Sequence, residues 1–294
     1  MNPAVNGLIS LYAAIFLLAG NGYFAKQIDM VVFDITAYRA ALAAIALFAF
    51  LALFNKKIRL QSGRHYALSV ALAGLLGVHW VAYFHSMRIS TVALGMTILY
   101  TYPIITIFLE RAVFKKAIRL VDVGVAIMVL IGIVLMVFPN PDAALETSDS
   151  NLQGVLTGLL SAFCFSCRNV FQQRYFRGYP AYQTIFYQVF IIAVVFLPFA
   201  SVGVTELAQM PSKEWGMLVL LGIVFTAMPH SLLANSLRTI SAKSVALIGC
   251  AQPVIGAGIA LVLLSEIPSM QVIIGALIVL SGAIYETVKP AKVS

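Results

Sequence analysis

Residues 97–114, TILYTYPIITIFLERAVF, and residues 246–266, ALIGCAQPVIGAGIALVLLSE, are two apolar stretches of similar pattern in the two halves of this 294-residue chain. Each stretch contains one proline, and Pro103 and Pro253 are 150 residues apart. Similarity at a fixed interval indicates an internal duplication. The second half of the chain is therefore predicted to repeat the fold of the first.

Further residues recur at almost the same interval. The pairs are Arg88 and Arg238, Gly132 and Gly282 at 150 residues, and Asn21 and Asn169, Gly74 and Gly222 at 148 residues. The two-residue difference fits a small insertion between positions 222 and 238. The duplication thus extends well beyond the two quoted stretches.

The composition is that of a membrane protein. Hydrophobic residues make up 61% of the chain, charged residues 10%, and the mean hydropathy is +0.96, which is more apolar side chain than a soluble domain can bury. A helix that crosses a bilayer needs about 20 apolar residues. Ten such stretches are predicted, at about 7–25, 35–54, 66–85, 91–109, 121–138, 153–172, 182–200, 215–234, 244–263 and 270–287.

The distribution of charge predicts the orientation. Most of the 19 lysines and arginines fall in alternate loops, as Lys56, Lys57, Arg59, Arg64, Arg111, Lys115, Lys116, Arg119, Arg174, Arg177, Arg238, Lys243, Lys289 and Lys292. The opposite loops hold most of the acids: Asp29, Asp34, Asp142, Glu146, Asp149, Glu206, Glu214 and Glu266. By the positive-inside rule both termini are expected in the cytoplasm, with the chain as a multi-pass protein of the inner (plasma) membrane.

The number of spans predicts inverted halves. Five spans are an odd number, so the second repeat enters the membrane from the side opposite to the first. The expected organisation is a first repeat at 1–138, an external linker at 139–152, a second repeat at 153–288 and a cytoplasmic tail at 289–294. Duplicated membrane units of this kind indicate transporters, in which two similar halves move around one site near the midplane.

These motifs resemble the EamA family of the drug/metabolite transporter superfamily. The resemblance rests on Ser90–Phe114, on Ser241–Glu266, and on the small-residue runs that end in GIVLM and GAIYE. It covers nearly the whole chain and implies an all-α membrane protein with ten transmembrane helices in two inverted five-helix repeats. It also implies secondary transport of small metabolites.

Within that family the aromatic residues near the third and fourth spans are most similar to YddG-type exporters of aromatic and other neutral amino acids. One position departs from the family pattern, which places a glutamate after the fourth span of each half. Glu266 supplies it in the second half, whereas Lys115 and Lys116 stand at the matching place in the first.

Aromatic and polar side chains at membrane depth are the candidate substrate-binding residues, because such groups are costly in lipid. In the first half they are Asn21, His79, Trp80, Tyr83, Tyr100 and Tyr102. Aromatic faces can stack on flat apolar groups and hold an ammonium group. The alternative, hydrogen bonding between neighbouring helices, remains open for each of these residues.

The second half adds Phe163, Asn169, His230 and Gln252 to the candidates. Phe163 as a packing residue and Asn169 as an interhelical hydrogen-bonding residue are the alternatives. For His230, which follows Pro229, the alternative is to satisfy a backbone carbonyl that the proline frees, a role open to Ser231 or a water as well. Pro103 and Pro253 are predicted to bend the fourth and ninth spans, with a contribution to gating.

Two further pairs are given structural roles. Arg39 and Arg168 are expected to extend toward a membrane interface, although attraction of an anionic group is an alternative. Cys164 and Cys167 form a C-x-x-C inside an apolar helix without nearby cysteine or histidine, so packing is favoured over redox or zinc chemistry.

The sequence predicts a transporter that needs no cofactor, metal or ATP. No P-loop motif is present, no carboxylate falls at mid-depth in a predicted span, and no partnered nucleophile suggests an enzyme. Facilitated diffusion or exchange is therefore expected, with a titrating His79 or His230 as the alternative. The partners are a small-molecule substrate and the bilayer, not nucleic acid, and the chain is expected to be a monomer, with a homodimer open.

The predicted function is export of small neutral or zwitterionic metabolites, amino acids first, by alternating access through a central cavity. A carrier of purines, sugars or nucleotide sugars is the alternative within transport, and the phosphorylated members of that group call for a lysine or arginine at mid-depth. No such residue is expected from the sequence. An intramembrane enzyme or a channel is the alternative outside that class.

Overall fold

The computed structural model describes residues 3–21, 24, 28–90, 92–115, 117–137, 149–256, 258 and 269–288, and these contain no β-strand. The predicted tail and most of the predicted linker lie outside this part of the chain, as do Glu266 and Lys116. The long helices are α1 (Pro3–Ala19), α3 (Val32–Leu53), α4 (Gly63–Ile89), α7 (Leu120–Val137), α8 (Asp149–Phe176), α9 (Ala181–Phe196) and α15 (Met270–Val288). The others are α5 (Val92–Leu99), α6 (Tyr102–Phe114), η2 (Leu197–Phe199), α10 (Val204–Gln209), α11 (Ser212–Gly222), η3 (Ile223–Ala227), α12 (Met228–Ser236) and α13 (Ala242–Gly249).

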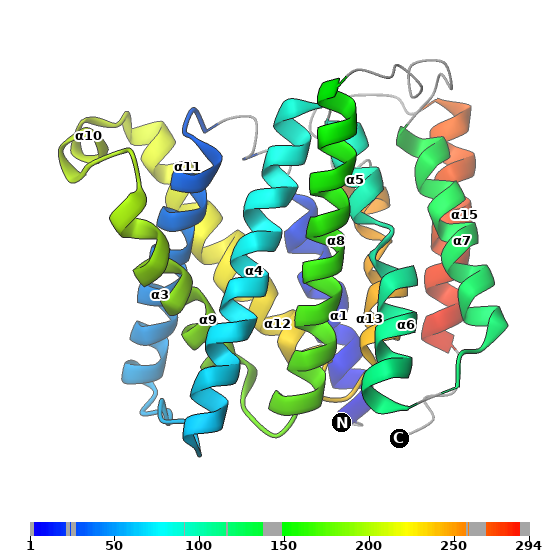
Figure 1. Cartoon of the computed structure of the whole chain (residues 1–294), viewed down its shortest axis with the longest axis horizontal. Coiled ribbons are helices and arrows are strands. Elements are labelled where there is room, and N and C mark those ends of the chain that lie inside the picture. The colour runs from blue at the N-terminus through cyan, green and yellow to red at the C-terminus, as the bar shows by residue number, and fades with distance from the viewer. Residues whose placement is uncertain are drawn as a thin grey trace.

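These helices form ten membrane spans, as the sequence predicted. Seven of the helical segments in the described part are long and apolar enough to cross a bilayer, and three shorter apolar segments, at Pro3–Ala19, Leu120–Met136 and Ala242–Gly256, complete the set. The spans stand side by side, and α1 begins and α15 ends toward the lower edge of the molecule (Figure 1). A rise of about 1.5 Å per residue makes a 20-residue helix match the hydrocarbon thickness.

The two five-helix repeats are inverted. The first begins with α1 at the lower edge, whereas the second begins with α8 at the upper edge (Figure 1). The contacts between repeats follow the same symmetry. The third span of each repeat packs on the first span of the other, as α4 on α8 and α12 on α1. Equivalent spans also pack on each other, as α3 on α9 and α7 on α15. Exchange of the repeats therefore maps the main contacts onto one another.

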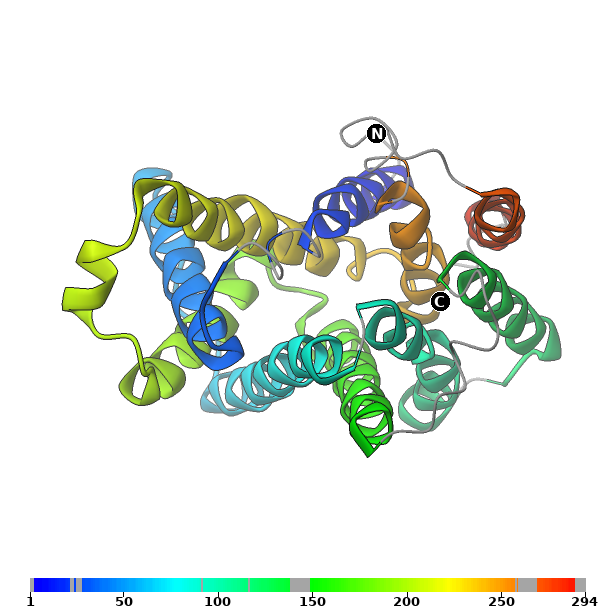
Figure 2. The ribbon, with the colours of Figure 1, turned by 90° about the horizontal axis from the view of Figure 1, so that it is seen from above.

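The view from above shows how the helices are distributed. The α3 and α9 helices lie toward one end of the molecule, and α7 and α15 lie at the other (Figure 2). Between these ends α1 and α12 form one side and α4 and α8 form the opposite side (Figure 2). Helices from both repeats thus meet in the middle of the molecule.

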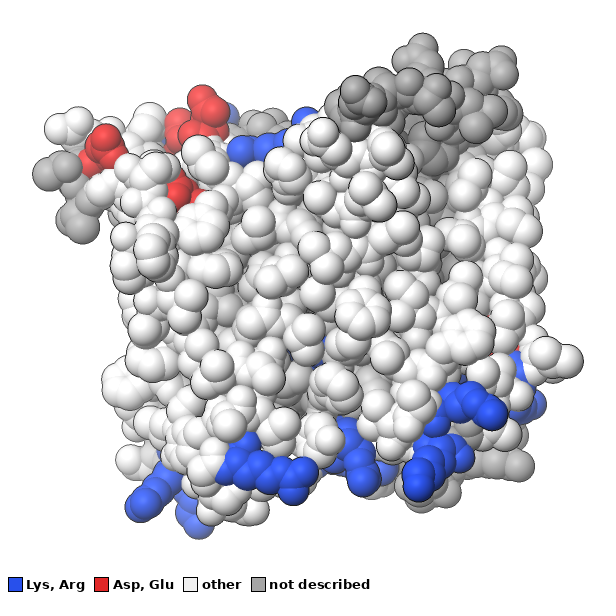
Figure 3. Space-filling view, viewed as in Figure 1, with Lys and Arg blue, Asp and Glu red and all other residues white. Residues whose placement is uncertain are grey.

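Charge is segregated between the two edges. Most visible lysines and arginines lie along the lower edge, the larger groups of acids lie near the upper edge, and a broad belt without charge separates them (Figure 3). Large apolar side chains such as Phe16, Ile45, Leu120 and Leu277 are exposed on the surface. Such a surface is unfavourable in water but suits contact with lipid tails.

The regular α-helix is interrupted in the fourth, eighth and ninth spans, and each interruption has a proline nearby. The fourth span breaks between α5 and α6 at Tyr100 and Thr101, and Pro103 occupies the first turn of α6. The ninth span breaks at Cys250 and Ala251, before Pro253. Proline cannot donate a backbone hydrogen bond and its ring crowds the preceding turn, so full breaks replace the simple bends that the sequence suggested.

Side chains form hydrogen bonds to backbone carbonyls beside the breaks in the fourth and ninth spans. The carbonyl of Tyr102 accepts hydrogen bonds from the hydroxyls of Thr106 at 2.8 Å and Ser166 at 3.0 Å. The hydroxyl of Tyr102 donates to the carbonyl of Ala246 in α13 at 2.9 Å. The two broken spans are therefore joined to each other across the repeat boundary.

The eighth span contains a π-helical turn, η3, just before Pro229. The hydroxyl of Thr226 donates to the carbonyl of Leu221 at 2.6 Å within this turn. The side-chain polar atoms of His230 and Ser231 have no hydrogen-bond partner. Within the described residues neither side chain therefore satisfies a carbonyl that Pro229 frees, which leaves water as the alternative.

Candidate functional site

A cavity of about 50 Å³ lies where helices of both repeats meet. Its lining residues come from α1, α3, α4, the broken fourth span, α8, α12 and the break in the ninth span. They are Leu18, Asn21, Arg39, His79, Trp80, Tyr83, Phe84, Leu99, Tyr100, Tyr102, Phe165, His230 and Gln252. The broken helices thus supply part of the wall, which is the usual place for a binding site in inverted-repeat carriers.

Stacked rings form one wall of the cavity. The His79 ring stacks on Phe165, with centroids 4.5 Å apart and an interplanar angle of 20°, and on Tyr83 at 6.1 Å and 9°. Tyr102 meets Phe165 edge-on at 5.2 Å. Because α4 and α8 belong to different repeats, this wall crosses the repeat boundary.

His79 is held in place by α8. Its Nδ1 atom lies 2.8 Å from the hydroxyl and 3.2 Å from the carbonyl of Ser161, and that hydroxyl also approaches the His79 carbonyl at 3.2 Å. The contact fixes the ring plane through one nitrogen. Nε2 is then the ring nitrogen left for the cavity, since the described residues offer it no hydrogen bond.

Several buried polar atoms around the cavity have no hydrogen-bond partner among the described residues. They are the hydroxyl of Tyr100, both ring nitrogens of His230 and the side-chain carbonyl of Asn21. Each buried unpaired polar group costs about 1–3 kcal/mol. These polar groups are enclosed in this conformation, so a ligand or water can satisfy them only when the side chains around the cavity move.

Two arginines are buried, not extended to an interface as the sequence suggested. Arg39 is 1% exposed and Arg168 is fully buried. Arg39 lines the cavity, with its guanidinium carbon 4.3 Å from the centroid of the Trp80 ring. The expectation that no cation lies at membrane depth is therefore wrong as well.

Arg168 is part of a hydrogen-bonded group behind the wall. Its Nε donates to Oε1 of Gln188 at 3.0 Å and its Nη1 donates to Oδ1 of Asn169 at 2.9 Å. Gln188 in turn donates to Gln172 at 2.9 Å. This group joins α8 to α9, and Asn169 serves it instead of the cavity.

Eight of the ten binding residues predicted from the sequence line this cavity. The exceptions are Asn169 and Phe163, and Phe163 is 49% exposed on the outside of α8. Phe165 takes the place that Phe163 was expected to fill. Residues two apart on a helix point about 200° away from each other, so the register of α8 decides between them.

Arg39, Phe84, Phe165, Leu18 and Leu99 were not predicted to line the site. Of these only Arg39 gave a signal in the sequence, as an arginine near the start of the predicted span 35–54. Its direction depends on Trp80 and Thr226, which lie far away in the sequence.

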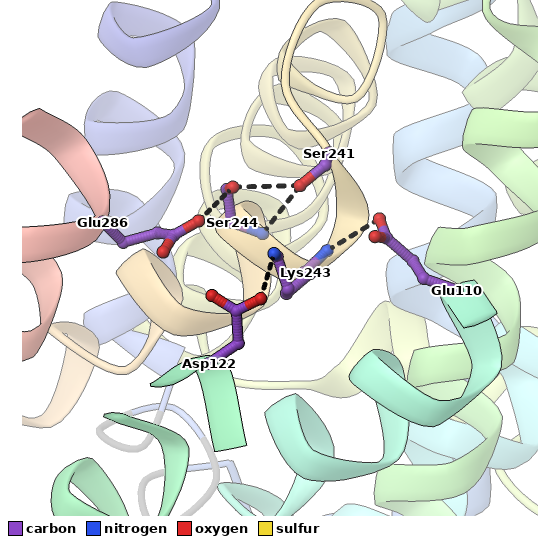
Figure 4. A network of polar contacts seen from close by, with 6 residues as sticks. All are labelled: Glu110, Asp122, Ser241, Lys243, Ser244 and Glu286. Atoms are coloured by element: carbon purple, nitrogen blue, oxygen red, sulfur yellow. Dashed lines mark hydrogen bonds and ion pairs between the residues drawn. The ribbon is translucent and has the colours of Figure 1, made fainter. Parts of the chain in front are cut away.

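A polar network joins helix ends near the lower, basic edge of the molecule (Figures 1 and 4). The first turn of α13 is bound by three buried carboxylates from three other spans. The backbone N–H of Lys243 donates to Glu110 at 3.0 Å, its Nζ lies 2.6 Å from Oδ2 of Asp122, and the hydroxyl of Ser244 donates to Glu286 at 2.5 Å. Carboxylates also suit the positive end of a helix.

A larger hollow of about 410 Å³ opens near the same edge. It is lined by the helix-end residues Pro3, Asn6, Gly7, Arg177, Asn235, Arg238 and Thr239. None of them comes from the breaks in the fourth and ninth spans. This hollow is separate from the cavity between the repeats.

Metal chemistry finds no support in the described residues. No group of three or more histidines, cysteines or acids among them could hold an ion. Cys164, Cys167 and Cys250 are buried free thiols.

Ten apolar spans in inverted repeats, broken helices and a cavity at the repeat boundary define the class of membrane transporters. The model of the EamA-like transporter family matches residues 5–138 and 152–286. The chain belongs to this family.

Two curated relatives come from Bacillus subtilis (strain 168). The chain is 21% identical to the "Uncharacterized transporter YxxF" over 94% of its own length and 87% of that relative. It is 25% identical to the "Uncharacterized transporter YdfC", over 77% and 73% respectively. A solved crystal structure matches with a TM-score of 0.78 at 17% identity, covering 97% of both chains, which supports the fold.

Proposed function

We propose that this transporter exports small neutral or zwitterionic metabolites with an apolar or aromatic side group, amino acids foremost. The observation that carries the proposal is the cavity wall, in which stacked rings stand beside unpartnered polar atoms. Rings bind an apolar side group through their faces and can also attract an ammonium group. The unpartnered atoms provide hydrogen bonds to a polar head.

The proposed mechanism is alternating access. The repeats, proposed at 1–138 and 153–288, rock about the boundary that the cavity and the two broken spans share. The network around Lys243 holds the basic end closed in the conformation described here, and its rupture opens that end. The proposed topology places the basic edge and both termini in the cytoplasm, within an inner membrane.

The proposed driving force is the substrate's own gradient, by facilitated diffusion or exchange. The cavity lining includes no aspartate or glutamate. Glu110, Asp122 and Glu286 are buried, but all three are bound into the network at the basic end. Proton relays in membrane carriers commonly use a carboxylate that the substrate pathway reaches, and a titrating His79 or His230 is the alternative.

Transport by the purified protein in proteoliposomes tests the proposal. Counterflow is measured against amino acids, purines, sugars and sugar phosphates. We expect amino acids with apolar or aromatic side chains to exchange and the other classes to remain near the rate of empty liposomes. Exchange of purines or sugars alone would replace the proposed substrate class.

Variants link that activity to the cavity. His79→Ala removes the stacked ring at the repeat boundary, and Tyr100→Ala removes a ring with an unpartnered hydroxyl. Both are expected to reduce exchange at least tenfold while the protein remains folded in the membrane. Phe163→Ala is the matched control, because Phe163 faces outward from α8. Unchanged exchange by both cavity variants would remove this cavity from the pathway.

A further inference from the structure

We infer that Arg39 is a specificity-determining residue whose guanidinium binds the carboxylate of the transported molecule. The inference rests on the proposed function, because it names the polar head that the same cavity recognises. It restricts the substrates to carboxylates with an apolar side group, zwitterionic amino acids included.

The guanidinium is fixed on two sides. Nε donates to Oγ1 of Thr226 at 3.1 Å, and that hydroxyl is itself held by the π-helical turn through the carbonyl of Leu221. The guanidinium carbon lies 4.3 Å from the Trp80 centroid and 5.6 Å from the Phe84 centroid. Because the guanidinium is already held by a hydrogen bond and by two rings, it loses little conformational entropy when a ligand binds.

The remaining edge of the guanidinium is available to a ligand. Neither Nη1 nor Nη2 of Arg39 hydrogen-bonds to a described residue, and neither is among the fully enclosed unpartnered atoms, whereas Nη2 of Arg168 is. Arg39 lines the cavity, but Arg168 does not. The two Nη atoms therefore have no hydrogen-bond partner in the described part of the chain, and they belong to a side chain that lines the cavity between the repeats.

No protein carboxylate neutralises Arg39 within the described residues. The ion pair found there joins Lys243 to Asp122 at the basic end. Asp34, on the same helix as Arg39, accepts hydrogen bonds from the backbone and hydroxyl of Ser201 and from the backbone of Val202. A buried cation without a counter-ion is costly, so an anionic ligand gains from entering this site.

The shape and composition of the site favour carboxylate over phosphate. A guanidinium fork matches the two oxygens of a carboxylate in one plane. Arg39 is the one lysine or arginine that lines the cavity in the described part of the chain, whereas a doubly charged phosphate calls for several cations. The stacked rings of His79 and Phe165 suit an apolar group attached to the carboxylate.

Ligand binding to a variant that retains only Trp80 as tryptophan tests the inference. Trp215→Phe leaves Trp80 as the single tryptophan of the chain, so fluorescence reports the residue that stacks on Arg39. The probes are L-phenylalanine, L-phenylalaninamide and inorganic phosphate. We expect phenylalanine to bind about tenfold or more tightly than its amide, as for a hydrogen-bonded charge pair, and phosphate not to compete.

Substitutions at Arg39 and Thr226 test whether the guanidinium recognises the carboxylate. The measured quantity is the preference for the acid over the amide. Arg39→Gln is expected to remove the preference for the acid over the amide, and Arg39→Lys to retain part of it. Thr226→Val frees Nε and is expected to reduce the preference while Arg39 remains. Arg64→Gln, at the exposed start of α4, is the control and should leave the preference unchanged.

The outcomes are distinguishable from failure of the proposed function. Exchange of no probe by the wild-type protein in proteoliposomes would sink the proposed function. Exchange of phenylalanine and its amide at equal rates would leave transport standing and overturn the role of Arg39. An acid preference that survives in Arg39→Gln, or tighter binding of phosphate than of phenylalanine, would overturn it as well.

Discussion

The Nζ atom of Lys243 lies 2.6 Å from Oδ2 of Asp122 and thereby joins the second repeat to the first at the basic edge. Asp122 is 2% exposed and the Lys243 side chain 18%. Loss of one partner of a buried pair costs about 3–5 kcal/mol when the other charge remains buried. If this end of the protein opens, water enters and solvates the charge that lost its partner. Most of the cost of burying that charge is then removed.

Lys243→Met is therefore expected to shift the protein toward opening at the basic edge. Cys250 reports this change, because it is fully buried at the break in the ninth span. In a Cys164→Ser, Cys167→Ser background we expect an impermeant thiol reagent, added from the basic side, to modify Cys250 at least fivefold faster. Lys57→Met, in an exposed loop, is the control for loss of charge. Equal rates in the parent and Lys243→Met would show that the pair does not hold this end closed.

Loss of the hydroxyl is expected to change the free energy of unfolding in opposite directions at Tyr100 and Tyr102. The Tyr100 hydroxyl is buried without a partner, whereas that of Tyr102 donates to the Ala246 carbonyl. Tyr100→Phe is expected to raise the free energy of unfolding by about 1 kcal/mol, and Tyr102→Phe to lower it by a similar amount. Thermal unfolding of the ligand-free protein in detergent measures both.

Ligand addition completes this comparison. Because Tyr100 lines the cavity and its hydroxyl has no partner in the ligand-free protein, Tyr100→Phe is expected to gain less thermal stability from a bound substrate than the wild type does. A lower melting temperature for ligand-free Tyr100→Phe would mean that its hydroxyl is already satisfied.

Large parts of the fold followed from the sequence because they depend on composition and periodicity. The ten spans, their inversion and the separation of charge need only local hydropathy and the repeat at 150 residues. Most of the cavity wall also followed, since rings and polar groups at membrane depth are rare and recur on one face of α4.

The remaining features depend on partners that are distant in the sequence. Phe165 and not Phe163 faces the cavity because Ser161 and His79 fix the rotation of α8. Arg39 is buried because Thr226, in a π-helical turn of another repeat, accepts its hydrogen bond. The network around Lys243 joins four spans, and its acids meet α13 only through the packing of those spans.

The close contact of α7 and α15 gives a prediction about stability. A Cβ on Gly275 would lie 2.5 Å from the carbonyl oxygen of Gly132, and backbone cannot yield there as a flexible side chain can. Gly275→Val is expected to separate the two helices and to destabilise the protein by about 1–3 kcal/mol. Gly124→Val is the matched control, because a Cβ on Gly124 meets nothing within 4 Å. Equal melting temperatures in detergent would show that α7 and α15 separate without cost.

A pH gradient should leave the rate of transport unchanged. The cavity lining contains no aspartate or glutamate, and Glu110, Asp122 and Glu286 are bound into the network at the basic end. Proteoliposomes with a fixed substrate gradient are compared with and without an imposed pH gradient, in both directions. Acceleration that disappears when an ionophore collapses the pH gradient would instead indicate proton coupling. His79→Gln would then test the imidazole, because glutamine retains hydrogen bonding without titration; loss of the acceleration in that variant would place the proton on His79, at the boundary between the repeats.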